Sequence, residues 1–205
     1  MSQAVKGRVS VRDLVSCALF AALIAVGTFV KIPTPLLPLT LQTLFVVLAG
    51  LVLGEKLGAV AAGIYAAAGL MGLPVFAAGG GIGYLLNPTF GYILSFIAGA
   101  WAAGFVAERL RPGMRTWMLA GLTNLAVLYA LGMAYYYPIA NYYLKTPFGV
   151  RAPFYYCFLL PLPGDLVKCL LGAVVTDRLR AMLPGGMLPA ASAGREVSDK
   201  EDIEG

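Results

Sequence analysis

The segment "LLPLPGDLVKCLLGAVV", Leu159–Val175, is apolar apart from Asp165 and Lys168, which lie three positions apart. A charged side chain at the centre of a bilayer costs at least about 2.5–3.5 kcal/mol, so charged residues inside a membrane span usually serve a purpose. Positions i and i+3 of a helix share one face. The segment therefore predicts a membrane-spanning helix that presents a paired carboxylate and ammonium to one side.

The composition of the whole chain indicates an integral membrane protein. Hydrophobic residues make up 60% of the 205 residues and charged residues only 12%, against about 25% charged in ordinary soluble domains. The net charge of +5 comes from basic residues that flank apolar runs, which favours a lipid bilayer as the partner and no nucleic acid. With no histidine and no Cys-x-x-Cys pattern, we expect no metal site and no cofactor. No hydrolytic constellation is present either, so an enzyme is not expected.

Six apolar spans can be drawn, which predicts an all-α integral membrane protein with six transmembrane helices. The second and third are short for a span, so they are expected to be tilted, kinked or partly surrounded by protein. The spans are about Leu14–Val30, Leu39–Leu53, Leu57–Gly72, Thr89–Ala107, Trp117–Tyr136 and Phe154–Met182.

The basic residues predict the orientation of these spans. With the N-terminus inside, nine fall on the cytoplasmic side and three outside, a bias typical of cytoplasmic loops. The cytoplasmic set is Lys6, Arg8, Arg12, Lys56, Arg109, Arg111, Arg115, Arg178 and Arg180, and the external set is Lys31, Lys145 and Arg151. We therefore expect a multi-pass protein with both termini in the cytoplasm.

Two connections on the predicted external side are unusually apolar. They are "KIPTPLLPLTLQT" (Lys31–Thr43) and "GLPVFAAGGGIGYLLNPTFGY" (Gly72–Tyr92), and the second carries no charge. Irregular backbone near membrane depth is tolerated only where protein or a cavity surrounds it. We expect both to fold over the outer end of the bundle as a lid. Residues 1–183 are then one transmembrane domain, followed by a disordered acidic cytoplasmic tail at 184–205.

Three kinds of residue stand out as candidates for a site. Asp165 and Lys168 form either a structural ion pair that holds helices in register or a ligand site in a protein-lined cavity, and the second interpretation is favoured. Asn87, before Pro88, fits a helix N-cap, which leaves its amide able to meet a ligand as well. Ala18 and Ala22 belong to a stripe of small residues that allows close approach of another helix, from within the bundle or from a partner.

Three motifs taken together resemble the BioY family. They are "IPTPLLPLTLQTLFVVLAGLVLG", "GLMGLPVFAAGGGIGYLLNPTFGY" and "PGDLVKCLLGAVV", and the resemblance runs from about Val11 to Leu183. BioY proteins are the biotin-specific substrate-binding subunits (S components) of energy-coupling-factor transporters in prokaryotic cell membranes. The resemblance implies a six-helix S-component bundle that binds biotin as a transported substrate. It also implies two partners, a transmembrane coupling protein and a pair of ABC-type ATPases.

The same resemblance implies residue roles. Asn87, Asp165 and Lys168 match the family positions that contact biotin, and Ala18 and Ala22 match the stripe that docks on the coupling protein. Candidates for the apolar walls and lid are Phe76, Tyr84, Phe90 and Tyr92. Two alternatives stay open at this point: an S component for another small vitamin, and a structural membrane protein in which the Asp165–Lys168 pair only stabilises the bundle.

Overall fold

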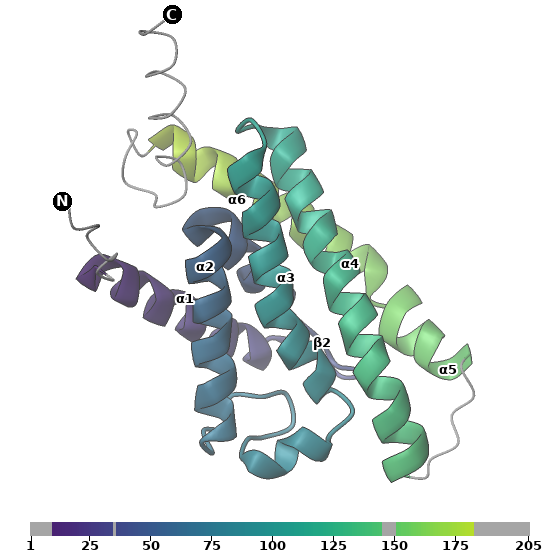
Figure 1. Cartoon of the computed structure of the whole chain (residues 1–205). Helices are drawn as coiled ribbons and strands as arrows, with labels where there is room; N and C mark the ends of the chain where they lie inside the picture. The colour runs from purple at the N-terminus through teal and green to yellow at the C-terminus, as the bar shows by residue number, and fades with distance from the viewer. Residues whose placement is uncertain (1–9, 35, 145–150, 183–205) are drawn as a thin grey trace, which may run out of the picture.

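The computed structural model describes residues 10–34, 36–144 and 151–182, and helices dominate this part of the chain (Figure 1). Long apolar runs fold as helices in a membrane because each backbone N–H and C=O must then be paired within its own segment. Of the shorter elements, η1 is a 3-10 helix, and η2 and η3 are π-helical. The elements are α1 (Val11–Phe29), β1 (Lys31–Ile32), β2 (Leu39–Thr40), α2 (Gln42–Leu70), η1 (Ile82–Leu86), α3 (Phe90–Arg109), α4 (Met114–Pro138), η2 (Ile139–Tyr143), α5 (Arg151–Phe154), η3 (Tyr155–Leu159) and α6 (Leu162–Met182).

The 29-residue element α2 reverses direction at Gly54 and so contains two antiparallel helical segments, as Figure 1 shows. Gly54 has φ = 85°, a left-handed conformation that glycine adopts without a steric penalty. The side-chain nitrogen of Gln42 lies 2.5 Å from the Tyr65 hydroxyl, whereas residues 23 positions apart in one straight helix would be about 34 Å apart. The predicted second and third spans are therefore both present, joined directly at Gly54.

Side chains from two other helices cap this reversal. The Glu108 carboxylate of α3 accepts a 2.8 Å hydrogen bond from the backbone N–H of Glu55, where the second segment begins. The Arg180 guanidinium of α6 donates at 3.2 Å to the Leu51 carbonyl, near the end of the first segment. A helix leaves unpaired N–H groups at its start and unpaired C=O groups at its end. Its dipole favours a negative charge at the start and a positive charge at the end. The caps therefore fasten α2, α3 and α6 together at this end of the bundle.

Five helical segments of the described chain are long and apolar enough to cross a membrane, α2 being counted as one of them. The count is five where six spans were predicted, because the second and third predicted spans both lie within α2. The first segment of α2 is short, but residues 46–54 are all buried. Protein rather than lipid surrounds it, so it need not reach across the whole hydrocarbon layer.

The start of the second span differs from the prediction. The second span does not begin at Leu39, because Leu39 and Thr40 pair with Ile32 and Lys31 in an antiparallel ladder. Prolines lack an N–H and break helices, so the proline-rich connection between α1 and α2 forms a short hairpin instead. The predicted sixth span, Phe154–Met182, is confirmed as one long apolar helical stretch, Tyr155–Met182, in which η3 precedes α6. The chain from residue 184 onward, where the acidic tail is predicted, lies outside the described residues.

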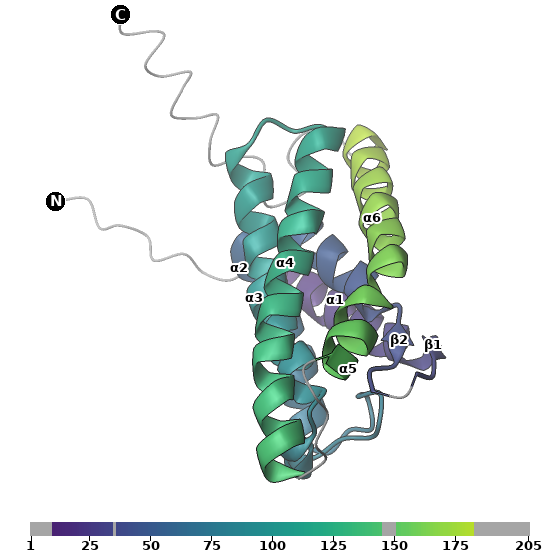
Figure 2. The same ribbon diagram turned by 90° about the vertical axis from the view of Figure 1, so that its right-hand side faces the viewer.

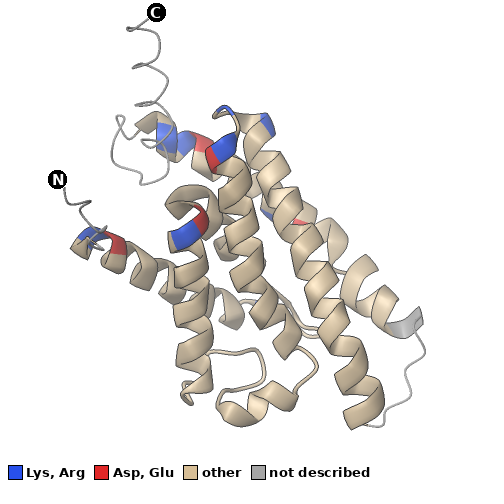
Figure 3. Ribbon diagram, viewed as in Figure 1, with Lys and Arg blue, Asp and Glu red and all other residues tan. Residues whose placement is uncertain are grey.

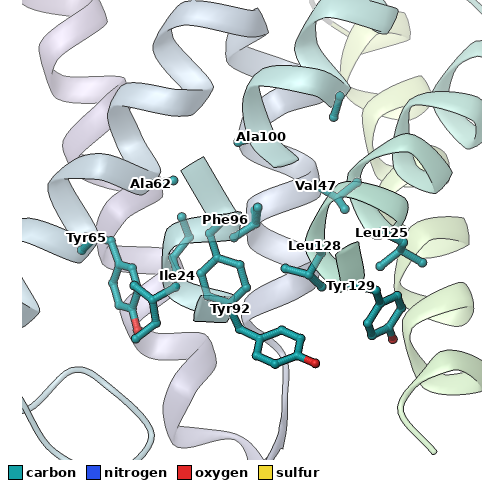
Figure 4. Packing of buried hydrophobic residues seen from close by; sticks show 14 of the residues in the cluster. Ile24, Val47, Ala62, Tyr65, Tyr92, Phe96, Ala100, Leu125, Leu128 and Tyr129 are labelled. Carbon is teal, nitrogen blue, oxygen red and sulfur yellow. The ribbon is translucent and has the colours of Figure 1, made fainter. Parts of the chain in front are cut away.

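The core lies where the two segments of α2 meet α1, α3 and α4. Figure 4 shows apolar side chains from these four helices packed together, among them Ile24, Val47, Tyr65, Phe96 and Leu128. Inside a bilayer such packing stabilises helix association through close contact rather than through removal of apolar surface from water. Charged residues gather at the turn of α2, the α3–α4 connection and the last turns of α6 (Figure 3). The β1–β2 hairpin and the loop after α2 lie side by side at the opposite end (Figure 2).

Candidate functional site

A cavity lies beneath the two apolar connections. It contains about 560 Å³ of empty space, including the part that opens outward. The proline-rich connection and the loop after α2 both contribute wall residues, and the Lys31 ammonium joins them by donating to the Ala77 carbonyl at 2.7 Å. The remaining walls come from α2, α3, α4 and α6. Polar wall residues are Thr40, Gln42, Thr43, Tyr84, Thr89, Tyr92, Tyr129, Asp165 and Lys168.

The predicted ion pair is part of this wall. The Lys168 ammonium lies 2.7 Å from Asp165 Oδ1, and the two side chains are only 12% and 5% exposed. Asp165 lies in the first turn of α6, where the positive end of the helix dipole stabilises a carboxylate. The i, i+3 spacing read from the sequence therefore does place both charges on one face, and that face borders the cavity.

Two further partners hold the pair in place. The Tyr129 hydroxyl of α4 donates to Asp165 Oδ2 at 2.5 Å, and the Lys168 ammonium also donates to the Thr40 carbonyl of β2 at 2.6 Å. A carboxylate offers about four acceptor positions and an ammonium three donors. Each group therefore keeps hydrogen-bonding capacity for a ligand in the cavity.

Sequence reasoning missed Tyr129 and Thr40. Tyr129 carries the only polar side chain in the stretch from Leu125 to Gly132, so a polar group inside an apolar span was a usable signal. Thr40 acts through its backbone carbonyl, for which its residue type carries no signal.

Asn87 does not lie among the residues that line the cavity. Its Oδ1 accepts hydrogen bonds from the backbone N–H and the hydroxyl of Thr89, at 3.0 and 2.8 Å. Thr89 lines the cavity and its hydroxyl is also 3.1 Å from the Tyr84 hydroxyl. The N-cap interpretation of Asn87 fits this geometry, because Asn87 has extended backbone angles and its side chain accepts from the backbone N–H two residues on. The regular part of α3 begins only at Phe90. The same side chain also orients Thr89 in a local side-chain turn.

The predicted aromatic wall is only partly at the cavity. Tyr84 and Tyr92 line it, and the Tyr92 hydroxyl donates to the Cys157 carbonyl at 3.1 Å. Phe76 and Phe90 are buried and are not among the lining residues. The ring of Phe76 packs behind Tyr84, with 4.7 Å between ring centroids. Phe76 therefore supports the wall from behind, and a direct contact with a ligand stays a prediction.

Ala18 and Ala22 lie on the exposed face of α1, opposite the buried residues Cys17, Ala21 and Ile24. Small side chains on an exposed helix face allow a second helix to approach closely. The stripe is therefore available to a partner and does not pack inside the bundle, although the identity of a partner stays a prediction.

The membrane-spanning helices, and beneath the apolar loops a mainly apolar cavity with an ion pair in its wall, define the class, a multi-pass membrane protein with a small-molecule site. The sequence model of the BioY family matches residues 1–185, and the chain therefore belongs to that family.

Individual relatives agree with this assignment. A protein of Lysinibacillus sphaericus named "Probable biotin transporter BioY" is 39% identical over 171 residues, 83% of this chain and 87% of that protein. The "Biotin transporter BioY" of Thermotoga maritima is 36% identical over 83% of this chain and 97% of its own length. The crystal structure of "the S-component for biotin from an ECF-type ABC transporter" superposes with a TM-score of 0.72 at 25% identity, covering 87% of this chain and 95% of that one.

Proposed function

We propose that this protein is a membrane-embedded biotin-binding subunit that mediates biotin uptake together with an energy-coupling module. One observation carries the proposal: a buried Asp165–Lys168 pair, braced by Tyr129, borders the cavity and keeps hydrogen-bonding capacity. The names of the relatives support biotin as the ligand.

The chemistry of biotin suits this wall. Its ureido group carries two N–H donors and one carbonyl, fused to an apolar thioether ring with a carboxylate-bearing tail. The remaining acceptor positions of Asp165 suit an N–H group, and the remaining donor of Lys168 suits an oxygen. Ile93, Phe96 and Leu128 line the same cavity and suit the apolar ring.

The same groups favour selectivity over other small vitamins. A ligand without matching polar atoms would exclude water from the cavity while leaving the pair short of partners. Buried polar groups left unpaired cost about 1–3 kcal/mol each, and charged groups more. In a purely structural role, by contrast, the pair would not need to border a cavity.

We further propose that Ala18 and Ala22 dock on a transmembrane coupling protein, which acts with a pair of ABC-type ATPases. Both termini are proposed to lie in the cytoplasm, with residues 1–183 as one membrane domain and 184–205 as a cytoplasmic tail. The exposed small-residue face of α1 and the basic residues at the charged end of the bundle support these assignments. A reporter that is active only in the cytoplasm tests the orientation: fused after Gly205 it should be active, and an inactive fusion that is made in full would contradict the assignment.

The function is tested by purifying the protein from cells grown with biotin and identifying co-purified small molecules by mass spectrometry. We expect biotin, and calorimetry on the ligand-free protein should show binding to biotin and not to thiamin or riboflavin. Retention of another vitamin would support the alternative S component, and retention of no vitamin with no binding would refute the proposal.

A further inference from the structure

A continuous chain of hydrogen bonds runs from the ion pair to both outer loops. The Lys168 ammonium donates to the Thr40 carbonyl at 2.6 Å, and the Thr40 hydroxyl donates to the Gln42 side-chain oxygen at 3.1 Å. The Gln42 side-chain nitrogen donates to the Tyr65 hydroxyl at 2.5 Å, and that hydroxyl donates to the Val75 carbonyl at 3.2 Å. Thr40 ends the β1–β2 hairpin and Val75 belongs to the loop after α2, so the chain joins the two connections that cover the cavity.

The central residues of this hydrogen-bond chain are buried and lie on helices. Gln42 is 5% exposed and Tyr65 is 1% exposed. They lie on the two antiparallel segments of α2, which the Gly54 reversal brings together. The Tyr65 ring is further fixed by an edge contact with Phe76, at 5.5 Å between centroids. The hydrogen bond between Gln42 and Tyr65 therefore cannot open unless the two segments of α2 or the side chains themselves move.

A second connection between the loops is weaker by comparison. Lys31 donates to the Ala77 carbonyl at 2.7 Å, but this bond is exposed to solvent. Water can replace an exposed hydrogen bond at small cost, whereas breaking a buried one leaves unpaired groups without a substitute partner. The Gln42–Tyr65 bond is buried, and the bonds that link it to Thr40 and Val75 are partly buried, so this chain of hydrogen bonds is the stronger restraint on loop opening.

We propose that Gln42 and Tyr65 are positioning residues that hold both outer loops closed over the cavity. Their hydrogen bonds also connect the closed loops to Lys168. The proposal rests on the proposed function, because it concerns how long the ligand stays bound. A ligand that orders Lys168 also orders Thr40, and through Gln42 and Tyr65 it orders the loop at Val75. Release of the ligand then requires this chain of hydrogen bonds, from Lys168 to Val75, to open; we call it the tether.

The test cuts the tether without changing the core. Tyr65→Phe removes the hydroxyl and keeps the ring that contacts Phe76. Gln42→Met removes the amide at nearly constant volume. Tyr136→Phe, which changes a buried tyrosine of α4 outside the tether, is the matched control. Two readouts are measured on the full chain: the dissociation rate of biotin, and the distance between spin labels on cysteines introduced at Ile32 and Ala78, both exposed.

We expect Tyr65→Phe and Gln42→Met each to release biotin about tenfold faster or more, because each variant loses two hydrogen bonds of this chain. The distance between the spin labels should become longer or broader in both variants, and Tyr136→Phe should resemble the parent. The double variant should be no worse than the more severe single variant, because the tether is cut only once.

Parent-like dissociation rates and label distances in both variants would overturn the proposal, as would strictly additive effects in the double variant. If Tyr65→Phe does not fold, the biotin dissociation rate and the spin-label distance of Gln42→Met decide on the proposal. The distances are also recorded without ligand. A parent protein that binds no biotin would therefore refute the proposed function, while the distances would still decide on the tether.

Discussion

Replacing Lys168 by methionine removes the ammonium but keeps most of its apolar stem. The change deletes the 2.7 Å contact with Asp165 and the 2.6 Å bond to the Thr40 carbonyl. Asp165 is only 4% exposed, so its charge would stay buried with no cation beside it. Removing one partner of a buried pair typically costs about 3–5 kcal/mol of stability. Biotin affinity should fall by about 2–5 kcal/mol, which is roughly a thirtyfold to several-thousandfold increase in Kd.

A second variant separates stability from ligand binding. Asp165→Asn combined with Lys168→Met removes both charges and so leaves no uncompensated ion. We expect the double variant to recover most of the stability that Lys168→Met loses, because isosteric neutral groups often replace a buried pair with little cost. Its biotin affinity should stay low, since the acceptor and donor that face the cavity are both gone.

Calorimetry with biotin and thermal unfolding in detergent, on each purified variant, measure the two quantities. Lys31→Met is the matched control, because this exposed lysine donates only to a loop carbonyl and should change affinity by about 1 kcal/mol or less. A double variant that binds biotin as tightly as the parent would show that the pair is structural. It would refute the assignment of Asp165 and Lys168 as ligand-binding residues.

Three further predictions test other parts of the structure. Asn87→Ala should weaken biotin binding by about 1–3 kcal/mol, because the threonine that it orients loses its partner; calorimetry that shows no change would remove Asn87 from the site. Ala18→Trp or Ala22→Trp should abolish uptake and complex assembly with the coupling protein while biotin binding stays intact, and loss of binding with normal assembly would place the stripe inside the bundle. Gly104→Ala should lower the free energy of unfolding by about 1–3 kcal/mol, because its Cβ would lie 2.3 Å from a backbone nitrogen of the turn in α2. Gly63→Ala, which meets nothing within 4 Å, should be neutral or stabilising in the same unfolding assay.

The sequence alone was enough to predict the class of protein, the spans and the ion pair. A low content of charged residues leaves too little polar surface for a soluble fold. Apolar runs in a membrane fold mainly as helices, because a helix pairs its backbone N–H and C=O groups internally. The i, i+3 spacing of Asp165 and Lys168 is a local property of one helix, so it carried over to the structure intact. The resemblance to the BioY family, judged on three motifs, agrees with the match to residues 1–185.

Only the tertiary structure decided which groups complete the site. Tyr129 is 36 positions from Asp165, and Thr40 is 128 positions from Lys168. No periodicity links such positions, because their meeting depends on how whole helices pack and where the chain reverses at Gly54. The side chain of Asn87 likewise depends on a turn that places Thr89, and not Asn87, at the cavity. Local pattern dictates what each segment can become, whereas the partners of a buried polar atom are set by packing between segments distant in the chain.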